Sequence, residues 1–487
     1  MPQRDEPAPT PQQIIDEQRR EIERLRDELR RSEEDRRRSE AERHRLRREN
    51  EKLKEELEAA RRAVSRQAAP FSRGTRVARP RRPGRKPGAA YGRRAHRLPP
   101  PYVDQRYSAP VPAACPHCAG PVRRMRVAPQ YQEDLPVQRP LVRRFDVHIG
   151  QCTQCGRRVP GRHPLQTSDA LGAAAVQLGP QAVAFAVLLN KRYGMAYGKI
   201  AGLLRDRFGL SVTRGALVHL VHRAARQARP TYATLCATVR GSPVVTVDET
   251  SWRVDAVLEW LWVWTTADTT VYAILPGRGL AQAASVIGLD YPGVLQHDGW
   301  HSYRSFTGAA HQTCLAHLLR RCRALLLESP GQPWVTAVKA LLQAALATRE
   351  AHRAGTVSAQ GLAVARGHYL ARLGRLLARR PSRHRRLAQL QQHLCNQFEA
   401  LFSFLFDPTL DATNWRAEHA LRPAVVTRKT CGGGNRTARG AASQQVLTSL
   451  LRTADQRGLD ATDVLVTLLT APTPIVPHGL RTPSAIH

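Results

Sequence analysis

The chain has 487 residues, with 75 Lys and Arg against 40 Asp and Glu, a formal net charge of +35. A surplus of this size favours a polyanionic partner, with nucleic acid first, although an Arg-rich genome would give the same composition. The sequence has no apolar run of about 18 residues and no apolar leader, so we expect neither a membrane span nor a signal peptide.

Residues 11–66 predict a long helix, because Arg and Glu dominate and neither Gly nor Pro occurs beyond the first few positions. A heptad register places apolar seam residues at both ends, among them Ile15, Ile22 and Leu53, and loses the seam between residues 32 and 43. This pattern favours a coiled coil that would make the protein a homo-oligomer, with a solvated single helix as the alternative.

Residues 67–104 change abruptly to Pro, Gly and Arg, with no acidic residue between Phe71 and Val103. Prolines at positions 80, 83 and 87 exclude a continuous helix. We therefore predict a disordered basic linker that lies along phosphates without reading sequence.

Residues 105–165 carry two CxxC pairs, Cys115 with Cys118 and Cys152 with Cys155, among short apolar stretches typical of small β structure. Four thiolates are the number that a closed tetrahedral zinc site needs, and the spacing lets both sulfurs of a pair face one ion. We predict a zinc ribbon with structural Zn²⁺; redox pairing or coincidence is the alternative. Cysteines in such pairs also indicate a reduced, cytoplasmic protein.

Residues 172–238 have a helical pattern that includes two short helices. The first helix is amphipathic and ends at Phe208, and Thr213 can cap the second. This arrangement resembles a helix-turn-helix, whose second helix enters the major groove of DNA. Such helix pairs also occur in plain helical domains. The second helix carries the candidate DNA-binding residues Arg214, His219, His222 and Arg223.

Residues 243–300 change to strands, at 244–247, 261–266, 270–275 and 294–296, with a helix at 280–288. The first strand leads directly into Asp248 and the last is followed closely by Asp298. Two carboxylates at the ends of neighbouring buried strands repel each other unless a cation lies between them. Oxygen ligands with open positions suit Mg²⁺ chemistry on phosphates.

A third carboxylate is expected from a helix at 411–421, after a mostly helical stretch from 314 to about 406. Asn414, Glu418 and Arg422 are spaced four residues apart and therefore share one helix face. Such a stripe can point Glu418 at metal ions while Arg422 meets a phosphate. A single Asp or Glu is usually a solvated surface charge, but three in this order of elements indicate a site.

Several long motifs resemble those of bacterial transposases of the insertion sequence 66 family, and the resemblance covers roughly residues 75–470. They are AspGluThrSerTrpArgValAsp (248–255), GluTrpLeuTrpValTrp (259–264), HisAspGlyTrpHisSerTyr (297–303), GlnThrCysLeuAlaHisLeuLeuArgArg (312–321) and ThrAsnTrpArgAlaGluHisAlaLeuArgProAlaValValThrArgLys (413–429).

This resemblance implies a DDE-type recombinase with Asp248, Asp298 and Glu418 as its acidic triad and two Mg²⁺ or Mn²⁺ ions as cofactors. The implied fold is an RNase H-like α/β domain over residues 241–430, with a helical insertion at about 315–408. The implied partners are double-stranded DNA, as terminal inverted repeats and as target, and companion proteins of the element. Two phosphoryl transfers, cleavage and joining, are the implied reaction.

Three further positions follow from the same resemblance. Cys314 and His317 match a CxxH element that supports the core, with a metal site as the alternative. Asp411 matches the family signature around the Glu. The position after Glu418 is usually Arg in the family and is His419 here, which removes a positive charge beside the site.

Residues 431–475 are predicted to form a basic, Gly-rich loop and closing helices. The loop begins with Arg428 and Lys429 and runs to Arg436, and its glycines permit close approach to phosphate. It lacks the spacing of a nucleotide-binding P-loop, and a plain flexible loop is the alternative.

The alternative to a transposase is a DNA-binding protein without catalysis, such as a regulator or a decayed transposase. It would share the charge, the ribbon and the helix-turn-helix, but it has no need of Asp248 and Asp298 at adjacent strand ends. A nuclease of related fold is a weaker third interpretation.

Overall fold

The computed structural model describes residues 23–36, 38, 40–42, 45–46, 49, 99–135, 139–172, 175–379, 384–430 and 434–482, with the side chains of Lys429 and Thr430 left out. The chain divides into two compact units, residues 1–82 and 83–487. The predicted linker up to residue 98 and most of the predicted coiled coil lie outside the described residues. No helix in the described parts of the chain is long and apolar enough to cross a membrane.

Within the first unit, residues 23–36 are helical and every one of them is exposed. Leu25 and Leu29, which belong to the predicted heptad seam, are 52% and 61% exposed. Pairing through this helix remains a prediction.

Residues 99–172 contain one short hairpin, β1 (Ile149–Gln151) and β2 (Arg158–Pro160), paired antiparallel. None of the described residues in this segment is buried. Apolar burial therefore contributes little to the order of the cysteine-bearing segment.

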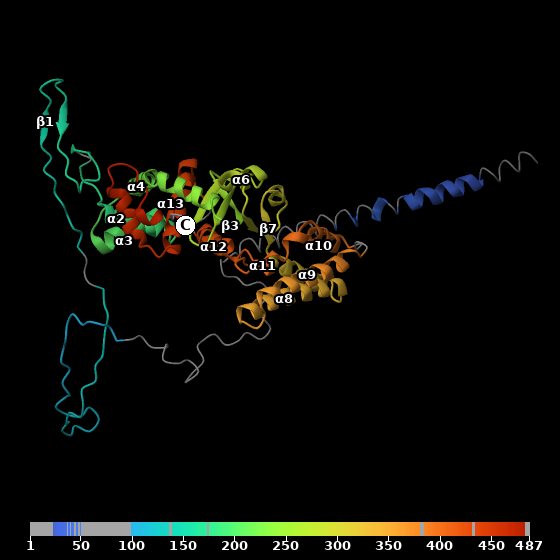
Figure 1. The fold of residues 1–487 in the computed structure, drawn as a ribbon, viewed down its shortest axis with the longest axis horizontal. Coiled ribbons are helices and arrows are strands. Elements are labelled where there is room, and N and C mark those ends of the chain that lie inside the picture. The colour runs from blue at the N-terminus through green and yellow to red at the C-terminus, as the bar shows by residue number, and fades with distance from the viewer. Residues whose placement is uncertain are drawn as a thin grey trace, which may run out of the picture. The chain divides into compact units, whose positions relative to one another are not determined.

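A five-stranded mixed sheet forms the centre of the second unit (Figure 1), in the order β5-β4-β3-β6-β7. β3, β4 and β5 form an antiparallel meander, while β6 and β7 run parallel to β3. The strands are β3 (Val244–Val254), β4 (Val257–Thr265), β5 (Thr270–Leu275), β6 (Val294–His297) and β7 (Ala310–Thr313). The four predicted strands are present, but β3 continues through Asp248 to Val254, so Asp248 lies within the strand and not at its end as predicted; β7 is a fifth strand that the sequence did not predict.

Helices cover both faces of this sheet. On one face α5 (Arg229–Arg240) and α6 (Leu280–Ile287) pack against alternate strand residues, including Val245, Trp262 and Trp264. On the other face α12 (Trp415–Thr430) packs against the opposite set, including Trp252 and Val263. Alternation along each strand therefore builds two separate apolar layers.

Helix α13 (Ala438–Gln456) protects the free edge of β5. Side chains four residues apart on the helix accept hydrogen bonds from alternate backbone N–H groups of the strand. The pairs are Thr270 N to Thr453 Oγ1 at 3.0 Å, Tyr272 N to Ser449 Oγ at 2.8 Å and Ile274 N to Gln445 Oε1 at 3.2 Å. One helical turn matches two strand residues in length, so the helix satisfies an edge that would otherwise pair with another chain.

The predicted helix pair is confirmed as α3 (Tyr197–Phe208) and α4 (Arg214–Gln227). Gly209 ends α3 in the left-handed conformation, and Thr213 Oγ1 accepts from Ala216 N at 3.1 Å to cap α4. The prediction was wrong for His222, which is buried and hydrogen-bonded to Ser443 at 2.7 Å. Together with α2 (Pro180–Lys191) and α14 (Ala461–Thr470), α4 shares a core with α13.

A separate helical group follows β7 and has its own apolar core. Its helices are α7 (Leu315–Glu328), α8 (Pro333–Arg353), α9 (Ala359–Leu377), α10 (Arg385–Asn396) and α11 (Ser403–Phe406). The chain leaves and rejoins the sheet at one point, since Leu315 N donates to Ala412 O at 3.0 Å.

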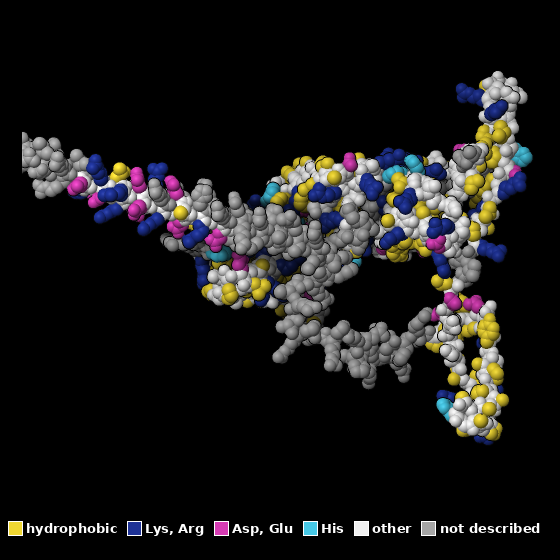
Figure 2. All heavy atoms as spheres, turned by 180° about the vertical axis from the view of Figure 1, so that it is seen from behind, with side chains coloured by type: hydrophobic (Ala, Val, Ile, Leu, Met, Phe, Trp, Pro, Cys, Tyr) yellow, Lys and Arg dark blue, Asp and Glu magenta, His cyan; other side chains and the backbone are white. Residues whose placement is uncertain are grey.

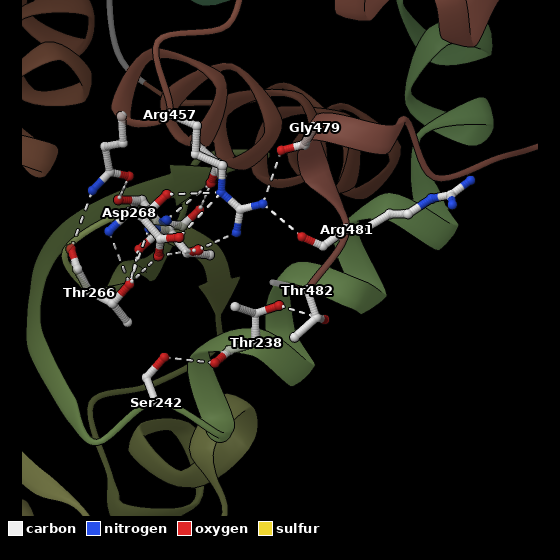
Figure 3. A network of polar contacts seen from close by, with 12 residues as sticks. Thr238, Ser242, Thr266, Asp268, Arg457, Gly479, Arg481 and Thr482 are labelled. Carbon is white, nitrogen blue, oxygen red and sulfur yellow. Dashed lines mark hydrogen bonds and ion pairs between the residues drawn. The ribbon is translucent and has the colours of Figure 1, made fainter. Parts of the chain in front are cut away.

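The turn between β4 and β5 is tied to the end of the described chain by Arg457 (Figure 3). Its guanidinium donates to the carbonyls of Gly479 and Arg481 at 3.1 and 2.8 Å and to Thr269 Oγ1 at 2.8 Å. Asp268 lies 3.5 Å from the same group. One side chain therefore fixes the far end of the meander against the closing segment.

Candidate functional site

β3 sends its two consecutive acids to opposite faces of the sheet. Asp248 follows Thr246 toward the face covered by α12, while Glu249 follows Val245 and Val247 toward the other face. Glu249 is buried there, where Arg278 forms an ion pair with it and Tyr303 donates a hydrogen bond to it. Only Asp248 is therefore directed at the helix that carries the third predicted acid.

Asp298 comes directly after β6, which runs parallel to β3 with Thr246 opposite Gln296, so Asp298 comes level with Asp248 along the strands. Its Oδ1 accepts from Trp300 N at 2.8 Å, which closes a tight turn. Gly299 has a φ of +90°, and a Cβ at this position would lie 2.7 Å from Cε1 of His393. Glycine is therefore required between the acid and an α10 side chain that packs against the turn.

Glu418 lies in the first turn of α12, close to both the sheet and α7. Asn414 precedes the helix and is buried; its Nδ2 donates to Asp248 Oδ2 at 3.3 Å and its carbonyl accepts from Glu418 N at 3.1 Å. From α7, Arg320 Nη2 lies 2.6 Å and His317 Nε2 3.5 Å from Glu418 Oε1. Asn414 thus links the first and third acids directly.

The three predicted acids are close enough to influence each other. Burial, together with the negative charges of Glu249, Asp298 and Glu418, raises the pKa of Asp248 to about 8. The described residues contain no group of three or more His, Cys, Asp or Glu side chains arranged to hold a metal ion. The three acids therefore lie near enough to affect one another, but they do not form a group arranged to hold a metal ion.

Sequence reasoning missed Arg278, whose guanidinium lies near both Glu249 and Asp298. It pairs with Glu249, its Nη2 lies 3.6 Å from Asp298 Oδ2, and its guanidinium lies 3.9 Å from the centre of the Trp300 ring. The strand alternation around Glu249 was the available signal, because a buried acid needs a cation. It could not have identified which cation.

The two residues of the CxxH element have different surroundings: Cys314 lies in the core, and His317 lies beside Glu418. Cys314 is buried, and burial raises its thiol pKa. His317 lies half-buried beside Glu418, and its Nδ1 has no hydrogen-bond partner. Burial and the charge of Arg320 lower the pKa of His317. No metal group containing this pair is found in the part of the chain that the structure describes.

Each CxxC pair forms the same tight turn. Ala119 N donates to Cys115 O at 2.8 Å, and Gly156 N donates to Cys152 O at 2.9 Å. Backbone N–H groups within the turns lower the pKa of both Cys115 and Cys152, with a smaller contribution from Cys118 and Cys155 respectively. Two sulfurs thus meet in each turn, but the described residues hold no group of four thiols.

The predicted DNA-binding residues differ in exposure. Arg214 and Arg223 on α4 are exposed, as are Arg422 and Arg436. The prediction that Arg428 and Lys429 begin a loop was wrong, because α12 continues past Pro423 to Thr430. Arg428 also donates to Ser251 on β3. Figure 2 shows Lys and Arg side chains spread over one face of the helices and sheet, with few acids among them.

His419 lies exposed on α12, with Nδ1 at 2.7 Å from Arg452 Nη2. His419 therefore contacts an arginine of α13. A second guanidinium at this position would face a like charge.

Comparison with protein families gives one match that covers more than half of the chain. The family model described as Transposase IS66 family matches residues 175–443. No curated protein matches the chain. The mixed five-stranded sheet with helices on both faces is consistent with the RNase H-like core of such transposases.

Proposed function

The chain belongs to the IS66 family of transposases, and we propose that it binds the terminal inverted repeats of its insertion sequence and catalyses Mg²⁺-dependent cleavage and transfer of DNA strands. Its family implies a function in DNA transposition and a catalytic transposase domain. The finer steps are inferred from the arrangement of side chains.

The observation that supports the proposal is the proximity of Asp248 in β3, Asp298 after β6 and Glu418 in α12, where Asn414 is hydrogen-bonded to Asp248 and to the backbone of Glu418. Asp248 of β3 has a raised pKa because it is buried and because Glu249, Asp298 and Glu418 add negative charge around it. A protein that only binds DNA gains nothing from a buried carboxylate, Asp248, with two further acids near it. Such a group favours a cation as its partner.

The three carboxylates fit Mg²⁺ or Mn²⁺, which prefer carboxylates and water. Asp248, Asp298 and Glu418 are the residues that would hold two such ions. When bound, the ions supply Lewis acid activation of the phosphate and lower the pKa of an attacking water. The mutual repulsion among the acids is the feature of this chain that fits that role.

The surrounding residues orient the acids and neutralise charge. Asn414 holds Asp248 through a hydrogen bond and fixes the start of α12 at the same time. Arg320 lies against Glu418, where it can meet a phosphate of bound DNA. Cleavage and joining are both phosphoryl transfers to an oxygen nucleophile, so neither requires a covalent bond to the protein.

DNA is held elsewhere by exposed cations. Arg214 and Arg223 on α4 would contact the terminal repeat, and Arg422 and Arg436 the phosphates near the cleaved bond. Arg428 would contribute by holding β3. The side chain of Lys429 lies outside the described residues, and its role in DNA binding remains a prediction from sequence.

The two cysteine turns would bind one structural Zn²⁺ ion. Each turn already pairs two sulfurs whose neighbouring N–H groups favour thiolate, which is the form that ligates zinc. Pairing of two DNA ends requires at least two active sites, and residues 11–66 offer a coiled coil for that purpose. Companion proteins of the element complete the proposed assembly.

The test is cleavage and joining of a labelled duplex that carries the terminal repeat of the element. We expect 3′ nicking with Mg²⁺ and none with EDTA. Glu418→Ala should lower the rate at least about 100-fold with unchanged DNA binding. Glu399→Ala, an exposed glutamate outside the site, is the matched control and should behave as wild type.

Tight binding without nicking by the wild type would favour the competing function, a DNA-binding protein or decayed transposase. Parallel loss of binding and cleavage in Glu418→Ala would have the same meaning. His419→Arg, tested beside the wild type, separates a copy weakened by this exchange from one that lacks a companion protein.

A further inference from the structure

A cavity of about 650 Å³ opens beside Asp298. The turn after β6 forms one side of it, and helices α7 and α10 of the separate helical group form the other. We refer to it as the Asp298 cavity. Its wall includes Trp300, Arg304, His317, Arg321, Ala324 and His393.

The charge of this cavity is strongly positive apart from the candidate catalytic acid. Arg304, Arg320 and Arg321 line it, and Asp298 is its one acidic residue among those that the structure describes. Arg320 pairs with Glu418, whereas Arg304 and Arg321 form no ion pair with any described residue. Two guanidinium groups are therefore available to an anionic ligand such as a phosphate.

Ring surfaces and unpaired ring nitrogens complete the wall. The rings of Trp300 and His301 lie 4.4 Å apart. His393 Nε2 and His317 Nδ1 are buried without a hydrogen-bond partner.

We propose that the Asp298 cavity receives one unpaired nucleotide of the DNA strand, next to the phosphate that the enzyme cleaves. The volume lies within the range of pockets that enclose small ligands, about 300–1,000 Å³, and is too small for a base-paired duplex. The exposed ring of His301 can stack on a base of any sequence, and the unpaired arginines Arg304 and Arg321 can bind its phosphate. The cavity begins at Asp298, so a nucleotide in it continues the strand held at the acids.

This inference rests on the proposed function, because it assumes that DNA is bound with a phosphate at the acids. An enzyme that acts on DNA gains access to a strand by taking a nucleotide out of the base stack, at the cost of one base pair. A nucleotide held in the Asp298 cavity would offset that cost. It would also keep the strand end fixed between cleavage and joining.

Two pairs of variants on α7 separate the cavity from the rest of the helix. Ala324→Trp places a large ring into the cavity, and Leu327→Trp, at a position 84% exposed on the same helix, is its control. Arg321→Ala removes a lining cation, and Arg323→Ala removes an exposed cation that does not line the cavity. None of these residues belongs to the proposed triad.

The measurement is permanganate oxidation of thymines in a duplex carrying the terminal repeat, bound to the full chain in EDTA. A nucleotide that leaves the stack exposes the thymine opposite to it, so oxidation reports unpairing without any cleavage. A mobility shift in the same samples measures total binding. We expect a reactive thymine beside the cleavage site with wild type, Leu327→Trp and Arg323→Ala.

Ala324→Trp and Arg321→Ala should lower that reactivity at least about fivefold while DNA binding changes less than about twofold. Equal reactivity in all five proteins, or bound DNA with no reactive thymine in the wild type, would overturn the cavity proposal alone. Absence of any DNA binding by the wild type would instead overturn the proposed function, and the cavity proposal with it.

Discussion

Residues 99–172 and residues 175–482 hold their candidate metal ligands in opposite ways. In the larger region, strands and helices enclose continuous apolar layers, and this packing holds the candidate ligands Asp248, Asp298 and Glu418 near one another. In the smaller region none of the described residues is buried, and the cysteines meet only as pairs. A packed core holds metal ligands in place before the ion binds. Ligands outside a core come together only when the ion binds.

Removal of zinc should have the largest effect, and only on the smaller region. Structural zinc supplies roughly 10–16 kcal/mol of apparent binding free energy that a coreless segment cannot replace. Chelation or Cys118→Ser should therefore expose residues 99–172 to protease. All seven Trp residues of the chain lie between 252 and 415, so their fluorescence should report an unchanged urea midpoint for the core.

Cys395→Ser, at an exposed cysteine outside the pairs, is the control for this experiment. A core midpoint that moves together with the protease sensitivity would show that the two regions do not differ in the way described.

Truncation of Trp264 should be the largest single change in the core. The side chain is fully buried, stacks on Trp262 at 5.7 Å between ring centres and donates to Ala283 O at 3.1 Å. Trp264→Ala should lower the free energy of unfolding by about 3–5 kcal/mol in urea titrations. Trp415→Ala, at a ring 48% exposed, should cost less than about 1 kcal/mol. Equal losses would mean that burial does not govern this region.

Ionisation of Asp248, the candidate catalytic acid of β3, should lower the free energy of unfolding of the core. The pKa of Asp248 is raised from 3.8 to about 8, so between these values the folded chain keeps a proton that the unfolded chain has lost. Stability therefore falls as pH rises through this window. In EDTA at pH 7, Asp248→Asn should raise the free energy of unfolding by about 1–3 kcal/mol.

The gain should shrink toward pH 4 and also with added Mg²⁺, which favours the ionised acid. Asp290→Asn, an exposed acid paired with Arg240, is the control and should show neither trend. A loss of stability in Asp248→Asn at pH 7 would contradict this account.

The cap of α4 should give the smallest effect. Thr213→Ala removes the side-chain acceptor for Ala216 N and should cost about 1 kcal/mol by thermal or urea unfolding. Ser211→Ala, two residues earlier and exposed, should be neutral. An effect of several kcal/mol would show that α4 depends on its cap more than on its core contacts with α13.

The sheet could be predicted where the sequence alternates between apolar runs and turns. β3 to β6 each contain Val, Leu or Trp runs that end in charged or Gly-rich turns, which is why Asp248 and Asp298 were identified. β7 was missed because its sequence, AlaHisGlnThr, has no apolar alternation. It is ordered by pairing with β6 and by hydrogen bonds of Gln312 and Thr313 within the core.

The sequence predicted Asp248, Asp298 and Glu418 as a triad, which stays a prediction, but it did not predict the residues that surround them. Arg278 lies in a turn 29 residues from Glu249, and no periodic pattern joins the two. His222 fits the exposed face of a recognition helix in sequence, yet α13 covers it. Helix α12 was predicted to end before Pro423, but proline forfeits only one hydrogen bond, and packing on β3 carries the helix further. Tertiary contacts decided each case.

The single point at which the chain leaves and rejoins the sheet has an evolutionary meaning. Leu315 N donates a hydrogen bond to Ala412 O at 3.0 Å, so the residues between them begin and end at the same place. These residues form the separate helical group with its own apolar core. Exchange of this segment would leave β3 to β5 in place but would remove the partners that Gln312 and Thr313 of β7 have in Leu401 and Gln397. Helix α7 supplies Arg320 and one wall of the Asp298 cavity. Exchange of the helical group would therefore change the surface beside the candidate catalytic acids. We therefore expect relatives that act on different DNA ends to differ more in the helical group than in the strands.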